Sequence, residues 1–351
     1  MFDRKARSRN MYKNIYHMLC YESSELEHMV PGDVFFENIQ GSEDLLAKLL
    51  LNSLDIWNRY SPMQEYTKTS ICSDRVVGEV DIFKSIVSGA LASGKIYCNV
   101  YKLDIDNPAN QMIKLAISII LKYTDHVNDA TYGRLKSYML EFDGVSTLDI
   151  FDYSAIRNDI EDLPSYYKPV IAASKIVIEN ILASDKQEGS ERSHLYVLED
   201  HTRYQFIFEG FVKNFYKTEY AHGGIKYTRH KWITRNDKGE RNGWSIPDVV
   251  MHNADKALII DTKWYARREF RDRDKGNQYQ MRAYMEEYLK EFPTTNKMTG
   301  VILYADTGEI KKDSFNMDGF SYKYYRRAIN LNQDFDQIKK DLIALADEYL
   351  K

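Results

Sequence analysis

The chain has 351 residues, of which 44% are hydrophobic and 28% are charged, and its formal net charge at pH 7 is −4. This is more chain than one hydrophobic core usually serves, so we expect at least two domains, and the composition excludes intrinsic disorder. The slightly acidic charge excludes a protein that coats nucleic acid with its whole surface. Any contact with DNA must therefore be local or shared with a partner.

The three cysteines are Cys20, Cys72 and Cys98. They are far apart and odd in number, which excludes a disulfide framework and a C-x-x-C zinc site and fits a reducing compartment. No run reaches the roughly 18 apolar residues of a membrane span, and no apolar segment follows the basic N-terminus as in a secretion signal. We therefore expect a cytoplasmic protein without membrane contact.

The N-terminal half combines helices with a small β structure. Apolar residues at helical spacing predict helices over 11–21 and 43–60. Short β-prone runs broken by glycines predict strands within 66–101, and residues 109–123 return to a helical pattern.

A turn-like sequence, DLPSYYKP, precedes a further predicted helix over 168–183. We place the domain boundary in this turn and expect domains over 1–163 and 164–351. The second domain should hold a helix at 203–217, a strand-rich stretch at 225–265, a helix at 278–290, a strand at 299–305 and a final helix at 333–350. Strands flanked by helices predict a mixed α/β or α+β domain.

One stretch in the second domain, IPDVVMHNADKALIIDTKWY at 246–265, places Asp248, Asp261 and Lys263 among apolar neighbours. We interpret it as a hairpin whose strands are 246–251 and 258–265, with HNADKA as the turn. Such a hairpin sets the two aspartates opposite each other. Because strand side chains alternate, Asp261 and Lys263 then share a face and Thr262 points away.

Two carboxylates placed this close repel each other, and a bound divalent cation removes that cost. Oxygen ligands favour Mg²⁺, with Asp248 and Asp261 as its ligands and the Thr262 carbonyl as a further one. Lys263 would orient or help to deprotonate an attacking water and offset charge on a phosphate. The pattern therefore predicts the metal site of a nuclease.

Two helices add candidates to this site. Glu209 lies at the edge of the apolar stripe of YQFIFEGFVKNFY and is a candidate third metal ligand. Gln280 and Tyr284 are spaced i,i+4 and so share one helical face, from which Gln280 would position the water or the DNA and Tyr284 would support the helix or contact DNA.

Each of these features also has a purely structural interpretation. Acidic-x-Lys triplets recur at Asp3-Arg4-Lys5 and at Glu309-Ile310-Lys311, Glu209 fits a helix-edge charge, and Gln280 with Tyr284 fits a packing pair. The order of the elements favours a site, because Asp261 ends an apolar strand and follows a Pro-Asp pair at hairpin distance.

A basic segment at 226–244 is the candidate DNA-binding surface. It carries two tryptophans and the cations Lys226, Arg229, Lys231 and Arg235, which suit contacts with phosphates. A solvated hairpin is the structural alternative.

Together these motifs resemble the PD-(D/E)xK nuclease superfamily: Pro247-Asp248, Asp261-Thr262-Lys263, the preceding helix and the later Gln280-x-x-x-Tyr284. With the opening NIYHMLCY at 14–21 and NPANQMIKLAISIIL at 107–121, the chain resembles the McrC family over nearly its whole length. Members of that family are the endonuclease subunits of McrBC modification-dependent restriction systems.

The resemblance implies a division of labour. A McrB-like AAA+ GTPase ring binds GTP and recognises double-stranded DNA with modified cytosine. The McrC-like chain docks its N-terminal domain on the ring, stimulates the GTPase, and cuts DNA with a Mg²⁺-dependent C-terminal domain of the restriction-endonuclease type. The absence of a G-x-x-x-x-G-K-[ST] phosphate loop agrees with GTP being bound by the partner.

One departure concerns Gly78, which is followed by Glu79 where the family often has arginine, although Arg75 lies close by. Two other functions stay open at this level. The chain would be a non-catalytic assembly factor of an AAA+ ring if the nuclease fold only binds, or a standalone repair nuclease of the same superfamily.

Overall fold

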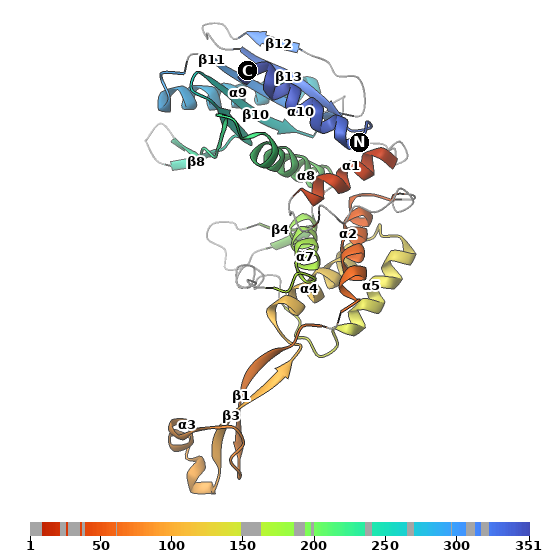
Figure 1. Cartoon of the computed structure of the whole chain (residues 1–351), viewed down its shortest axis with the longest axis vertical. Coiled ribbons are helices and arrows are strands. Elements are labelled where there is room, and N and C mark those ends of the chain that lie inside the picture. The colour runs from red at the N-terminus through yellow and green to blue at the C-terminus, as the bar shows by residue number, and fades with distance from the viewer. Residues whose placement is uncertain are drawn as a thin grey trace. The chain divides into compact units, whose positions relative to one another are not determined.

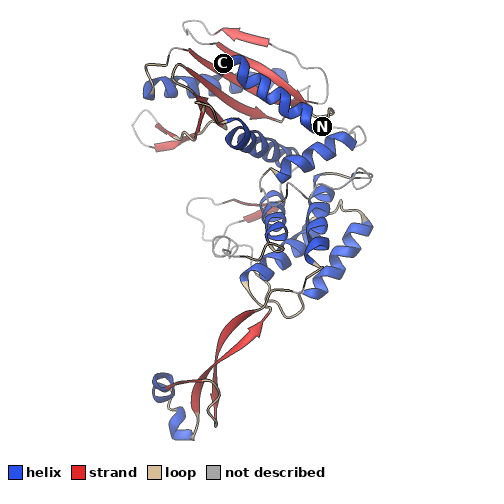
Figure 2. Ribbon diagram, viewed as in Figure 1, coloured by secondary structure: helices blue, strands red, loops and turns tan. Residues whose placement is uncertain are grey.

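The structure is a computed structural model that describes residues 9–21, 26, 36, 39–60, 62–148, 163–185, 194–197, 200–235, 241–264, 270–295, 297–306, 313–316 and 323–351. The chain is mixed α+β, as the sequence predicts (Figures 1 and 2). None of its described helices is both long enough and apolar enough to cross a membrane.

The chain divides into two compact units. Unit 1 comprises Met1–Leu49, Asp125–Asn128 and Glu179–Lys351, and unit 2 comprises Leu50–Thr124 and Asp129–Ile178. The predicted boundary between residues 163 and 164 falls inside unit 2, and the first helix belongs to unit 1.

Helix α1 (Arg9–Cys20) explains why the N-terminal residues join the C-terminal unit. The Asn14 Nδ2 atom donates to the backbone carbonyls of Leu331 at 2.8 Å and Gln333 at 2.7 Å. The ring of Tyr21, just after the helix, meets the ring of Phe211 edge-on at 5.1 Å. These partners are more than 180 positions away in the sequence, so a boundary based on local pattern does not detect them.

Unit 1 is built on a six-stranded sheet with the order β12-β13-β11-β10-β9-β6. Strands β10, β11 and β13 are mutually parallel, and β9, β6 and β12 are antiparallel to their neighbours. The described elements of unit 1 after α1 are β4 (Leu182–Asp185), β5 (His194–Val197), α8 (Asp200–Phe215), η5 (Tyr216–Tyr220), β6 (Lys226–Thr228), β7 (Trp232–Arg235), β8 (Arg241–Ser245), β9 (Val249–His252), β10 (Lys256–Lys263), α9 (Phe270–Glu291), β11 (Lys297–Asp306), β12 (Asp313–Asn316), β13 (Lys323–Asn330) and α10 (Phe335–Leu350).

Helix α9 packs closely on one face of this sheet. Its Met281 and Met285 lie in one buried cluster with Ala257 and Ile259 of β10. A Cβ atom on Gly300 of β11 would lie 2.6 Å from the sulfur of Met281, so a larger residue there would require the methionine side chains to move.

Unit 2 joins a group of helices to a three-stranded antiparallel sheet with the order β1-β3-β2. Its elements are β1 (Glu65–Ser73), β2 (Glu79–Asp81), α3 (Ile82–Val87), η4 (Ala90–Ser93), β3 (Ile96–Asp104), α4 (Pro108–Tyr123) and α5 (Asp129–Glu141). Helices α2 (Ser42–Trp57) and α7 (Lys168–Ile181) contain two of the four points at which the chain passes between the units.

A short α-helix and a 3-10 turn interrupt the predicted strand region of 66–101. Asp81 caps α3 by accepting a hydrogen bond from the Lys84 backbone N–H at 2.9 Å. Gly78 has φ +81°, and a Cβ there would lie 2.4 Å from the Asn99 carbonyl oxygen, so a side chain is excluded. The following Glu79 pairs with Lys68 at 3.4 Å on the surface.

The end of this sheet around α3 exposes an apolar surface, which we call the apolar tip. Its side chains are all at least 37% exposed. They are Val76, Val77, Val80, Ile82, Phe83, Ile86, Val87 and Leu91. Figure 1 shows α3 at the end of the β1–β3 ribbon away from α4.

Other differences from the predicted elements are local. Helix α9 begins at Phe270, eight residues before the predicted start, and α5, β12 and β13 have no counterpart in the sequence-based prediction. The charges of FRDRDK mask the helix start, because the apolar periodicity begins only beyond it.

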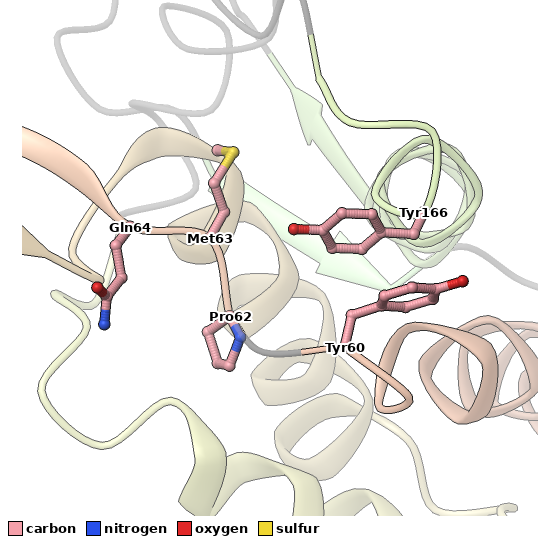
Figure 3. A pocket seen from close by; sticks show the side chains of 5 residues that line it. All are labelled: Tyr60, Pro62, Met63, Gln64 and Tyr166. Carbon is pink, nitrogen blue, oxygen red and sulfur yellow. The ribbon is translucent and has the colours of Figure 1, made fainter.

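Unit 2 also has a hollow of about 560 Å³ beside the start of β1. Its lining includes the rings of Tyr60 and Tyr166, which stack at 4.4 Å between centroids (Figure 3). The other lining residues are Pro62, Met63 and Gln64, so among the described residues that line the hollow there is no carboxylate, imidazole or amine.

Candidate active site

The candidate site forms where the β9–β10 hairpin opens. Strand pairing runs from His252 opposite Ala257 to Val249 opposite Ile260. Asp248 directly precedes Val249 and Asp261 directly follows Ile260, so the two aspartates lie at the same end of the hairpin, just beyond its last pair. The turn itself is shorter than predicted, because His252 and Ala257 are already paired.

Asp248 lies just before β9, and its carboxylate accepts hydrogen bonds from Thr262 of β10. Its Oδ2 accepts hydrogen bonds from the Thr262 backbone N–H at 2.6 Å and from the Thr262 hydroxyl at 2.7 Å. Thr262 was expected to point away from the charges. Its hydroxyl instead donates a hydrogen bond to Asp248.

Asp261 and Lys263 share a face of β10, as strand alternation predicts. The Lys263 Nζ atom is 2.5 Å from Asp261 Oδ2, and the side chains are only 13% and 2% exposed. The Lys263 ammonium is therefore the partner of this buried carboxylate oxygen.

Helix α8 brings a stripe of polar side chains to the same place. Gln205, Glu209 and Lys213 are spaced by four residues and so lie on one face of the helix. Glu209 is half-buried and lies within electrostatic range of Asp248, Asp261 and Lys263. Gln205 and Lys213 were not predicted as site residues, although their spacing from Glu209 was a signal in the sequence.

Helix α9 ties its polar face to the segment that carries Asp248. The Tyr284 hydroxyl donates to the Ile246 carbonyl at 3.0 Å and accepts from Gln280 Nε2 at 2.6 Å. Tyr284 is buried, with 3% exposure, so it presents no surface to DNA. Its location corrects the DNA-contact part of the prediction and agrees with a supporting role. Gln280 itself is exposed.

The carboxylates hold their protons more tightly than ordinary acids. Burial, and then the charge of Asp248, raise the pKa of Asp261 to about 7. The same two causes raise the pKa of Glu209 to about 7. Burial also raises the pKa of Asp248, despite the two hydrogen bonds from Thr262 that lower it. The protein therefore gathers more negative charge here than Lys263 and Lys213 neutralise.

This donor set fits a hard divalent cation. Mg²⁺ is commonly held by one or two carboxylates and keeps several waters, and Asp248 and Asp261 supply two such groups at the same end of the hairpin. Within the described residues, no three His, Cys, Asp or Glu side chains are grouped closely enough to hold a metal together. The Thr262 carbonyl already accepts a hydrogen bond from Gln205 Nε2 at 2.9 Å.

The predicted DNA-binding cations lie on or beside strands β6 and β7. Lys226 on β6 and Arg229 just after it are exposed. The Lys231 Nζ atom lies 3.8 Å above the ring of Trp244, across the β7–β8 pair. Arg235 ends β7, and its side chain is outside the described residues.

The raised pKa values predict how stability depends on pH. Below about pH 4 the site carboxyls are protonated in both the folded and unfolded states. The ordinary pKa is 3.8 for Asp261 and 4.5 for Glu209, and folding raises both to about 7. Between these values, a rise in pH removes protons that the folded protein binds more tightly than the unfolded chain does. We therefore expect the site to lower the free energy of unfolding progressively between pH 4 and pH 8 when no divalent cation is present.

Thermal melts in a chelator between pH 5 and pH 8 measure this effect. The informative quantity is the difference between the wild type and Glu209→Gln, which should grow in favour of the variant as pH rises. Asp255→Asn, at the exposed turn between β9 and β10, is the control and should show no such trend. A difference that is constant with pH would contradict the raised pKa of Glu209.

Comparison with known proteins agrees with this architecture. The profile of the family described as "McrBC 5-methylcytosine restriction system component" matches residues 4–297. A curated protein of Escherichia coli (strain K12), the "Type IV methyl-directed restriction enzyme EcoKMcrBC", is 23% identical over 354 residues, which cover 97% of this chain and 98% of that protein. A solved chain in a half-complex of Thermococcus gammatolerans McrB AAA+ hexamers with bound McrC aligns with a TM-score of 0.52 at 14% identity, covering 95% of this chain and 76% of that one.

The fold and the site define an α+β protein with a buried carboxylate–lysine group at the open end of a hairpin. The family match covers most of the sequence, and the chain belongs to the McrBC 5-methylcytosine restriction system component family. The similarity to the solved complex shows the fold alone.

Proposed function

We propose that this chain is the Mg²⁺-dependent DNA endonuclease subunit of a McrBC-like restriction system and that unit 1 has the PD-(D/E)xK nuclease fold. The observation that carries this proposal is the convergence of Asp248, Asp261 and Lys263 at the end of a mixed sheet, with Glu209 approaching from α8. Buried carboxylates with raised pKa values beside a lysine are typical of catalytic sites.

Each polar group has a distinct part in phosphodiester hydrolysis. Asp248 and Asp261 would hold Mg²⁺, which supplies charge neutralisation for the phosphate and lowers the pKa of the attacking water. Lys263 offsets the negative charge that builds on the phosphate oxygens. Glu209, whose pKa is raised by burial and by the nearby charge of Asp248, would complete the metal shell from α8. Gln280, which is exposed beside Tyr284, would position the water or the DNA.

The DNA would run over the strands next to the site. Lys226, Arg229, Lys231 and Arg235 belong to or follow β6 and β7, and the exposed cations among them suit phosphate contacts. The net charge of −4 leaves this grip weak, so delivery to DNA depends on a partner. We propose double-stranded DNA with modified cytosine as the substrate, because the similar E. coli protein is named a methyl-directed restriction enzyme.

The partner would be a McrB-like AAA+ ring that binds GTP. The similar solved chain comes from an assembly of McrB AAA+ hexamers with bound McrC. On this chain the apolar tip supplies a docking surface, because a cluster of exposed aliphatic and aromatic side chains is typical of a protein interface. We propose that the tip enters the ring and stimulates its GTPase.

The decisive experiment is cleavage of a cytosine-methylated plasmid by this chain together with a McrB-like AAA+ protein, Mg²⁺ and GTP. Cutting that needs both proteins and the methylation supports the proposal. A ring whose GTPase rises with this chain but which never cuts DNA indicates a non-catalytic assembly subunit. Cutting by this chain alone, without regard to methylation, indicates a standalone nuclease.

The tip is tested by Phe83→Asp. Phe83 is 78% exposed, so a charge there should leave the fold and its melting temperature unchanged. Truncating a central aromatic residue of an interface typically costs 2 kcal/mol or more, so we expect binding to the ring to weaken by at least about 30-fold, with GTPase stimulation falling in parallel.

Leu140→Asp on α5 is the matched control, because Leu140 is equally exposed at 75% but lies away from the apolar tip. Co-elution with the ring and the GTPase rate are the measurements. Equal binding by the wild type and Phe83→Asp would remove the tip from the interface.

A further inference from the structure

The edge of β10 changes partners beside the proposed catalytic residues. On one side the strand stays paired with β11 as far as Lys263 opposite Tyr304. On the other side its pairing with β9 ends at Ile260 opposite Val249. The backbone groups of Thr262 and Trp264 that point to this open side need other partners, because buried peptide groups without hydrogen bonds are costly.

Gln205 of α8 fills this gap with its side-chain amide. Its Nε2 donates to the Thr262 carbonyl at 2.9 Å, and its Oε1 accepts from the Trp264 backbone N–H at 2.5 Å. In a parallel sheet, one residue makes this same pair of hydrogen bonds to the neighbouring strand. It bonds to the carbonyl of the residue before its opposite neighbour and to the N–H of the residue after that neighbour. The residue flanked here is Lys263.

Aromatic side chains of α8 on either side of Gln205 also pack against the end of β10. The buried indole of Trp264 stacks on Tyr204 at 5.0 Å between ring centroids and meets Phe208 at 6.1 Å. Gln205 lies between these two aromatic residues in the sequence, and Glu209 follows them. One helical turn therefore holds the backbone on both sides of Lys263 and carries the neighbouring carboxylate.

We propose that Gln205 is a positioning residue that replaces the absent strand at the edge of β10 and so holds the Lys263 ammonium beside Asp261. This inference rests on the proposed nuclease function, because Lys263 is taken to act on the phosphate. Without the amide, the carbonyl of Thr262 and the N–H of Trp264 lose their partners and the strand end shifts. Small displacements of a catalytic group are costly, with a shift of about 1 Å lowering rates by up to about 100-fold.

Gln205→Met tests this role, because methionine has a similar length and forms neither bond. We expect kcat for DNA cleavage by the complex to fall by roughly 10- to 100-fold, as for other residues that orient catalytic groups, and KM for DNA to stay within about two-fold. The control is Asn214→Leu in the same helix. This variant removes a hydrogen bond from a side-chain amide, which Asn214 Nδ2 donates to the Tyr21 carbonyl at 3.2 Å. It should lower the melting temperature comparably and leave kcat unchanged.

A second measurement does not depend on cleavage. The side chain of Lys263 is 13% exposed and paired, so its amine should acetylate slowly, and Gln205→Met should raise that rate relative to the rate at Lys256 on the other end of β10. A faster rate at Lys263 together with reduced kcat supports the proposal. An unchanged rate at Lys263, or a fall in kcat equal to that of Asn214→Leu, overturns it.

If the wild-type complex cuts no DNA, the proposed nuclease function fails, whereas the acetylation rates still decide whether Gln205 positions Lys263.

Discussion

Asp261→Asn should abolish DNA cleavage and at the same time raise the melting temperature of the metal-free protein at pH 8. Loss of cleavage follows because the variant removes a charged ligand from the proposed Mg²⁺ site, and we expect a fall of at least roughly 10³-fold, at the upper end of the effect of removing one electrostatic group from an active site. The gain in stability follows from the raised pKa of Asp261, about 7, which means that its charged form is unfavourable at pH 8.

Removing the charge should raise stability because burial and the charge of Asp248 destabilise the Asp261 carboxylate more than its ion pair with Lys263 stabilises it. A gain of about 1 kcal/mol in the free energy of unfolding corresponds to a rise of about 2–4 °C in the melting temperature of a domain of this size. Mg²⁺ should stabilise the wild type and not the variant, since the cation binds the charged pair. Asp255→Asn on the exposed turn is the control for both measurements and should match the wild type. A variant that still cuts DNA would remove Asp261 from the proposed metal site.

Replacing Lys263 should also remove cleavage, but with the opposite effect on stability. Lys263→Met takes the nearest cation away from Asp261, whose Oδ2 lies 2.5 Å from the Lys263 amine. We expect kcat to fall by about 10²- to 10³-fold, the usual cost of one group that stabilises transition-state charge. The metal-free protein should melt at a lower temperature at pH 8, because the buried carboxylates are then less compensated.

Lys256→Met, at the other end of β10, is the control for Lys263→Met because the Lys256 amine bonds only to a surface-exposed carbonyl, that of Lys351, at 2.8 Å. Lys263→Arg separates two roles of the amine, since arginine keeps the charge but does not release a proton at neutral pH. Partial activity of the arginine variant indicates charge stabilisation, whereas loss equal to that of methionine indicates proton transfer. Unchanged kcat in Lys263→Met would exclude Lys263 from the chemistry.

The two aspartates and the lysine of the candidate site were predictable from the sequence because their relations are local. Asp248 and Asp261 belong to one hairpin, and the alternation of β10 alone puts Asp261 and Lys263 on one face. The helices 11–21, 109–123 and 333–350 were predictable for the same reason, because an amphipathic pattern repeats within each segment.

The role of Gln205, which was missed, and the burial of Tyr284, which was predicted only as a site residue, depend on contacts between distant segments. Gln205 bonds to a carbonyl 57 positions away, and Tyr284 to one 38 positions away. Neither partner is visible in the local pattern around these residues, and an amide or a phenol on a helix fits many environments equally well. The membership of α1 in unit 1 likewise depends on bonds from Asn14 to carbonyls 317 and 319 positions away.

The sequence by itself determined the α+β class, most of the helices, the family resemblance and the carboxylate–lysine group, because periodicity and hairpin spacing act over a few residues. Only the tertiary structure decided which helix completes the open edge of β10, that Tyr284 is buried, and that three separate chain segments form unit 1. The physical reason is that buried backbone groups must find partners wherever the packed chain brings a donor or an acceptor, and packing is a property of the whole fold.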